Sequence, residues 1–119
     1  MNKALLAAGA IDGAIAVAAG AFGAHALKER LTDKALAVFE TAARYQMYHA
    51  LAIVLCAAVA GSVAGARLSG WLFQAGIVVF SGSLYALALT DVKLLGAITP
   101  FGGLAFIAGW VWLAVSALR

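Results

Sequence analysis

Charged side chains are absent from three long stretches of the 119-residue sequence, and this absence restricts the fold more than any motif does. The stretches run from Ala50 to Ala66, from Leu68 to Thr90 and from Leu94 to Leu118, and a fourth, from Ala4 to Ala24, contains only Asp12. A helix needs roughly 20 mostly apolar residues to cross the hydrocarbon core of a bilayer. None of the stretches alternates polar and apolar residues, as the strands of a membrane barrel do. The sequence therefore predicts an integral membrane protein with four spanning helices.

Composition excludes several other classes of protein. Apolar residues make up 66% of the chain and charged residues 11%, whereas soluble domains have about 45–50% and about 25%. The net charge of +3 comes with no basic stripe and no recognition motif, so nucleic acid is not an expected partner. Cys56 is the only cysteine, which excludes an intramolecular disulfide and a cysteine-based metal site. We expect Cys56 to pack in the core or against lipid.

These patterns predict a single all-α domain over residues 1–119. Its spans are expected at about 4–27, 45–65, 71–90 and 100–118. The start of the chain imitates a secretory signal with a cleavage site near Ala24-His25-Ala26. Asp12 within the apolar run and the length of that run favour a retained first span.

An amphipathic helix is predicted between the first two spans. Thr32 or Asp33 can cap its start, and we expect it to lie at the membrane interface before running into the second span. Glu40 and Arg44 stand four residues apart, in the order that favours an ion pair. Aromatic rings collect at the headgroup depth of membranes, and this depth is expected for the segment Tyr45–Tyr48.

Small residues indicate where helices pack against each other. In the first span one face carries Gly9, Asp12, Gly13, Ala16, Gly20 and Gly23. In the third span the small, hydroxylated segment 80–85 favours another contact. For the fourth span, Thr99 as N-cap and Pro100 as first helical residue are the expected start. A longer helix from near Leu94 with a kink at Pro100 is the competing interpretation.

Two groups of residues are candidates for function. Asp12 is an ionisable group inside a span, which costs about 2.5–3.5 kcal/mol on insertion scales and marks a functional hypothesis. Either it couples proton movement, or it forms a structural hydrogen bond with Gln74. His25 ends the first span and His49 begins the second, so both are expected at one membrane face, close to Arg44, Tyr45, Gln46 and Tyr85. Such a pair of histidines could ligate haem or a metal, or handle protons or small molecules; the structural alternative is two interfacial histidines with ordinary hydrogen bonds.

Four segments in this order resemble the YgdD/YwdK-like family of small bacterial membrane proteins, a domain-of-unknown-function family (DUF423) that includes the eukaryotic transmembrane protein 256. The segments are Gly20–Leu27, Arg44–Leu51, Phe80–Tyr85 and Thr99–Gly103, the last followed by Gly109-Trp110. The resemblance covers nearly the whole chain and implies a multi-pass inner-membrane protein without an assigned activity. Asp12 lies outside the matching segments.

No catalytic motif, cofactor motif or metal-ligand spacing is present in the sequence. The leading hypothesis is a non-enzymatic protein that acts through lipid, self-association or other membrane proteins, as an accessory subunit of a membrane complex. The first alternative is a small proton-coupled transporter, working as a dimer with Asp12 as the coupling carboxylate. The second alternative is a haem or metal protein that uses His25 and His49.

The distribution of Lys and Arg predicts the orientation. Five of these residues fall on the side of the loop after the first span, and three fall on the side of the termini. Because positive residues concentrate in cytoplasmic loops, both termini are expected outside the cytoplasm.

Overall fold

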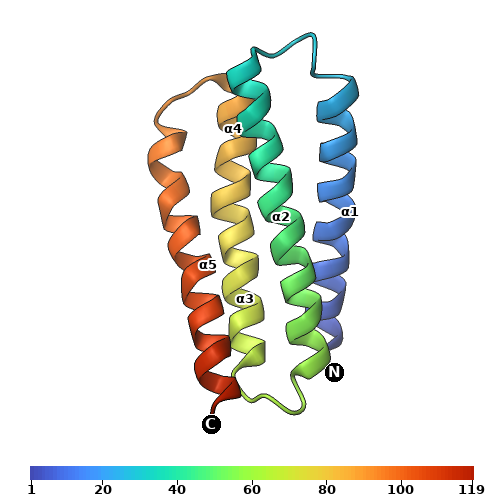
Figure 1. The fold of residues 1–119 in the computed structure, drawn as a ribbon, viewed down its shortest axis with the longest axis vertical. Helices are drawn as coiled ribbons and strands as arrows, with labels where there is room; N and C mark the ends of the chain where they lie inside the picture. Colours follow the sequence, from blue (N-terminus) through green and yellow to red (C-terminus); the bar gives the residue numbers. More distant parts are fainter.

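A computed structural model describes residues 1–119, and all of its regular structure is helical (Figure 1). α1 comprises Lys3–His25, α2 Asp33–Val59 and α5 Leu95–Ala117. Between α2 and α5, three segments follow end to end as one rod: α3 (Ala66–Gly76), the π-helical turn η1 (Ile77–Ser81) and α4 (Gly82–Thr90). Four helical rods are thus long and apolar enough to cross a membrane. The predicted fold class, an all-α protein with four such helices, is confirmed.

The four rods stand side by side and alternate in direction (Figure 1). Each packs mainly on its neighbours in the order α1, α2, the α3–α4 rod and α5, so α1 and α5 lie at opposite edges. The molecule measures 49 × 26 × 18 Å, which makes it a flattened slab with both termini at one end. Because α1 is held mainly by α2, its side toward α4 is incompletely covered.

The main hydrophobic core lies in the half of the slab nearest the termini. All four rods contribute to it, through Leu5, Ala52, Ile53, Cys56, Ala57, Ala66, Phe73, Ile77 and Phe106. A Cβ atom added to Gly70 would lie 2.9 Å from both methyl carbons of Leu5, so this glycine lets α1 approach α3 closely. Cys56 is fully buried in this core, as expected. A smaller cluster of Leu27, Phe39 and Ala88 closes the opposite half.

The small-residue face of α1 packs against protein over most of its length. Gly9, Asp12, Ala16 and Gly23 are buried, and a Cβ atom on Gly9 would lie 3.0 Å from the carbonyl oxygen of Ala50 on α2. Gly20 is exposed, and nothing lies within 4 Å of its Cβ position. The prediction was therefore wrong for Gly20, because α1 contacts α2 mainly through the other members of the face.

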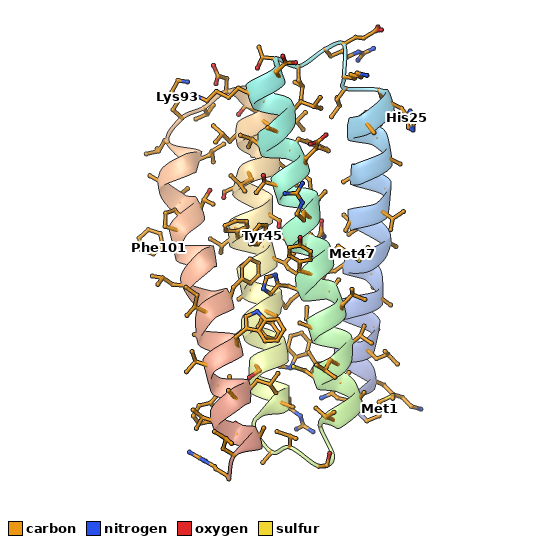
Figure 2. All side chains as sticks on the ribbon, in the orientation of Figure 1. Met1, His25, Tyr45, Met47, Lys93 and Phe101 are labelled. Atoms are coloured by element: carbon orange, nitrogen blue, oxygen red, sulfur yellow. The ribbon has the colours of Figure 1, made fainter.

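The predicted amphipathic helix is the first part of α2 and runs directly into the second span, as expected. Thr32 Oγ1 accepts a hydrogen bond from the backbone N–H of Ala35 at 3.1 Å, which confirms the expected cap. α2 then continues without a break to Val59 and ends earlier than the predicted residue 65. Tyr45 and Met47 consequently lie near the middle of the bundle and not at one end (Figure 2). The expected Glu40–Arg44 ion pair is not formed; the one ion pair joins Lys93 to Asp91 at 3.5 Å, at the exposed turn before α5.

The small, hydroxylated segment of the third rod does make helix contacts, as predicted. Ser81 Oγ donates to the carbonyl oxygen of Ala42 at 2.8 Å, and this bond ties the π-helical turn η1 to α2. Ser83 Oγ and Thr99 Oγ1 are 2.6 Å apart and join α4 to α5. The rod begins at Ala66, five residues before the predicted start of its span.

The expected start of the fourth span at Pro100 was wrong, and the longer helix from near Leu94 is the one observed. Three backbone N–H groups at the start of α5, those of Leu95, Gly96 and Ala97, donate to carbonyl oxygens three residues earlier. The start therefore needs no side-chain cap. Pro100 lies inside α5, where it removes the hydrogen bond to the Gly96 carbonyl.

Candidate functional site: a polar cleft between α1 and α4

A cleft of about 560 Å³ opens between α1 and the α3–α4 rod, in the region between the two hydrophobic clusters. Each surrounding element supplies one large polar side chain: Asp12 from α1, Gln46 from α2, Gln74 from α3 and Tyr85 from α4. Asp12 is about 14 Å along α1 from Lys3, at 1.5 Å per residue. The polar group is therefore in the membrane-spanning part of the bundle. We call this site the Asp12 cleft.

Three of these side chains form one hydrogen-bonded chain. The Tyr85 hydroxyl donates to Gln46 Oε1 at 2.7 Å, and Gln46 Nε2 donates to Asp12 Oδ1 at 3.3 Å. Asp12 and Gln46 are only 5% and 4% exposed. These hydrogen bonds run from α4 through α2 to α1. They therefore link α1 to the α3–α4 rod, although the two make little direct contact.

Two oxygen atoms of the Asp12 cleft have no hydrogen-bond partner. They are Asp12 Oδ2 and Gln74 Oε1, and both are buried. A buried acceptor without a donor costs about 1–3 kcal/mol. Both atoms are acceptors, so in this arrangement neither satisfies the other without a proton or another donor between them, although the Gln74 side chain is close enough to bond Asp12 through its amide N–H groups. The Asp12 cleft therefore has an unused capacity for hydrogen-bond donors.

The mouth of the Asp12 cleft is apolar and faces the side of the bundle. Ile11, Ile15 and Val78 line it and are 60%, 48% and 64% exposed. In a protein whose helices cross a bilayer, such side chains contact lipid acyl chains. A polar floor is thus reached through an apolar opening.

The sequence identified the main residue of this site but not its immediate partners. Asp12 lies on a protein-packed face, as predicted, and Gln74, its predicted partner, lines the same cleft. Gln46 and Tyr85 were expected near the histidines, yet both bond toward Asp12. One signal was available, since Gln46 is the only amide side chain in the middle of α2.

His49 belongs to a separate aromatic cluster between α2 and α5. Its Nδ1 donates to the carbonyl oxygen of Tyr45 at 2.8 Å, and its Nε2 accepts from Trp110 Nε1 at 3.1 Å. A carbonyl can only accept and an indole N–H can only donate, so the ring is the neutral Nδ1–H tautomer. The ring also stacks on Phe106 with centroids 3.6 Å apart. Neither nitrogen has a free lone pair for a metal or a haem iron.

The expectation that His25 and His49 share one membrane face was wrong. His25 is exposed at the end of α1 (Figure 2), whereas His49 lies about 24 Å along α2 from Asp33, at 1.5 Å per residue. The reason is that α2 begins at Asp33, so its residue 49 is deep in the bundle and not at the start of a span. The structure therefore does not bring the two histidines together as a pair of ligands.

The remaining candidates, Arg44 and Tyr45, lie on the outer surface of α2. Arg44 is exposed and forms no ion pair. Tyr45 is 37% exposed, and its ring packs on Phe80 with centroids 4.9 Å apart. Neither residue lines the Asp12 cleft.

Comparison with known proteins identifies the family. A family model described as a protein of unknown function (DUF423) matches residues 19–103. The chain is 47% identical to the UPF0382 membrane protein SH2409 of Staphylococcus haemolyticus, covering 98% of this chain and 97% of that protein. It is also 47% identical to the UPF0382 membrane protein YwdK of Bacillus subtilis, covering 98% of each. No solved structure matches. With this identity over nearly its full length, the chain belongs to the DUF423 (UPF0382) family of membrane proteins, as its sequence segments indicated.

Proposed function

We propose that this membrane protein is non-enzymatic and acts through helix contacts inside the bilayer, as an accessory subunit of a larger membrane complex. The observation that carries the proposal is a row of exposed small residues on α1, at Ala10, Ala14 and Ala18. These residues line a groove of about 630 Å³ together with Met47 and Leu51 of α2 and five further residues, two of which are glycines.

Small residues at four-residue spacing let a second helix approach closely. Within a bilayer no hydrophobic force drives helices together, because lipid tails are as apolar as the side chains. Association then depends on close packing, and a row such as Ala10-Ala14-Ala18 supplies a surface for it. The occupant that this groove fits is a spanning helix of another membrane protein.

The test is affinity purification from the protein's own membranes in a mild detergent, with the variant Ala14→Leu. We expect the wild type to retain a distinct membrane protein at fixed stoichiometry, and Ala14→Leu to lose it because the leucine fills the groove. Val111→Leu is the matched control, since it enlarges an exposed residue of α5 that does not line the groove. A wild type that elutes alone, or only with copies of itself, contradicts the proposal.

A second candidate function is proton-coupled transport by a dimer, and the unpartnered Asp12 Oδ2 favours it. A buried carboxyl inside a span is the kind of group on which proton relays depend. Asp12→Asn in proteoliposomes should abolish substrate-driven proton flux. Flux unaltered by this substitution would remove the transport candidate.

We further propose residence in the inner membrane with both termini outside the cytoplasm. Lys28, Arg30, Lys34 and Lys93 belong to the end of the bundle opposite the termini, against Lys3, Arg67 and Arg119 at the other end, while Arg44 lies about 17 Å along α2 from Asp33 and no longer counts for either side. A green fluorescent protein fused after Arg119 should remain dark and a fused alkaline phosphatase should be active. The reverse pattern contradicts this orientation.

A further inference from the structure

We propose that the Asp12 cleft binds a lipophilic amine, with the ammonium group between Asp12 Oδ2 and Gln74 Oε1 and the apolar body toward the mouth. This inference concerns a small-molecule site. It goes beyond the accessory role proposed above and does not depend on it.

The two unpartnered oxygens define the polar end of the ligand. Asp12 Oδ2 and Gln74 Oε1 are buried acceptors, and Asp12 itself is 95% buried. A proton on Asp12 Oδ2 could join it to Gln74 Oε1, but it would remove the charge of the carboxylate, whereas an ammonium group pairs that charge. A primary ammonium group carries three N–H donors, so one nitrogen can serve both oxygens and bond a third acceptor as well.

The charge of the cleft also favours a cation. Its lining contains one carboxyl group and no lysine or arginine, and its other titratable group is the Tyr85 hydroxyl, which connects to Asp12 through Gln46. An ionised carboxylate is costly inside a membrane unless it is paired. An ammonium ligand supplies both the missing counter-charge and the missing donors.

The shape of the cleft defines the rest of the ligand. A volume of about 560 Å³ is within the range of about 300–1,000 Å³ that is typical of small-molecule sites. Ala8 and Ile77 line the walls, and the exposed side chains of Ile11, Ile15 and Val78 form the rim. A ligand that passes this rim comes from the lipid phase, so it needs an apolar body.

The experiment measures binding of tritiated 1-adamantylamine to the full-length protein in phosphatidylcholine nanodiscs, with protein-free nanodiscs subtracted. We expect saturable binding that unlabelled 1-adamantylamine displaces. The alcohol of the same shape, 1-adamantanol, should displace it at least tenfold less well because it carries one donor and no charge. Absence of saturable binding, or equal displacement by the two compounds, overturns the proposal.

Two variants test the position of the site. Asp12→Asn keeps an oxygen that can accept from Gln46 Nε2 but removes the charge, and it should weaken amine binding at least tenfold. Gly82→Leu should also abolish binding, because Gly82 lines the cleft and nothing lies within 4 Å of its Cβ position. Gly20→Leu is the matched control, since Gly20 has equal free space but lies outside the cleft.

The variants also keep folding and the other proposals separate. Each variant must elute as the wild type does in size-exclusion chromatography, and Gly82→Leu leaves Asp12 in place if Asp12→Asn fails to fold. Wild-type affinity in a folded Gly82→Leu protein overturns the site. Amine binding without proton flux supports the site and contradicts transport, while loss of partner capture in Ala14→Leu leaves amine binding unchanged.

Discussion

Both ring nitrogens of His49 are used in hydrogen bonds, and this makes His49 a structural residue of the α2–α5 contact. Trp110 Nε1 donates to Nε2, and Nδ1 donates to the Tyr45 carbonyl. The ring is 5% exposed and lies against Phe106 and Phe73. An unpaired nitrogen in such surroundings has no water to bond.

The substitution Trp110→Phe tests this contact. It keeps an aromatic ring but removes the indole donor, so the buried Nε2 of His49 loses its partner. We expect the free energy of unfolding to fall by about 1–3 kcal/mol, measured by steric trapping in bicelles. Trp71→Phe is the control, since Trp71 is 43% exposed and forms no side-chain hydrogen bond in the structure. Equal effects of the two substitutions would contradict the structural role of this hydrogen bond.

At the candidate site, sequence predicted the residue but not the side from which its partners come. A carboxyl group in an apolar run is conspicuous, so Asp12 was identified directly. Gln46 and His49 are three residues apart on α2, and helix positions at this spacing are about 60° apart. One of them faces α1 and α4 while the other faces α5, and only the arrangement of the rods decides which. The sequence alone therefore placed Gln46 and Tyr85 with the wrong residue.

At the level of elements, the contact between α5 and η1 depends on one glycine. A Cβ atom on Gly102 would overlap the backbone nitrogen of Phe80 and lie 2.7 Å from its Cα atom. On the next residue, Gly103, an added Cβ would meet Phe80 Cδ2 at an ordinary 3.9 Å. The backbones of the two rods are thus in contact at Gly102 and separated by a side chain at Gly103.

This pair of glycines gives a matched test. Gly102→Ala should lower the free energy of unfolding by about 1–3 kcal/mol, because the rods must move apart. Gly103→Ala should be neutral, or stabilising by up to about 1 kcal/mol, because alanine favours helix. Thermal unfolding in the same detergent measures both variants. A Gly102→Ala variant as stable as Gly103→Ala would contradict the close approach.

The elements themselves were predicted more accurately than their ends. Uncharged runs of spanning length determine that four helices form, because backbone groups in hydrocarbon must be paired within the helix. The observed ends of the helices differ from the predicted ends where the sequence has no residue that stops or starts a helix. α2 keeps the start predicted after Thr32 but ends at Val59, six residues before the predicted end of its span. At the start of α5, the first backbone N–H groups donate to the carbonyl oxygens of residues 92–94. The helix therefore begins before Thr99 and does not need the cap expected there.

At the scale of the whole molecule, the chain forms an open row of rods and not a closed bundle. α1 and α5 lie at opposite edges (Figure 1), so lateral surfaces remain uncovered between neighbouring rods. Two of these uncovered surfaces are hollowed. One is the groove that Ala10, Ala14 and Ala18 of α1 line together with α2, and the other is the Asp12 cleft between α1 and α4. Large apolar side chains such as Phe101, which is 69% exposed, project outward on α5 (Figure 2). Both proposals depend on these lateral surfaces facing lipid.

The most direct test of whether these surfaces face lipid measures how often a spin label collides with dissolved oxygen and with a water-soluble nickel chelate. Cys56 is first replaced by alanine. The label is then attached to a single introduced cysteine, either at Val78, on the rim of the Asp12 cleft, or at Lys93, in the turn before α5. For the protein in lipid vesicles, we predict that the Val78 label collides mainly with oxygen, which dissolves in the hydrocarbon. The Lys93 label should collide mainly with a water-soluble nickel chelate. A Val78 label that the nickel chelate reaches as freely as it reaches Lys93 would contradict a cleft that opens to the bilayer.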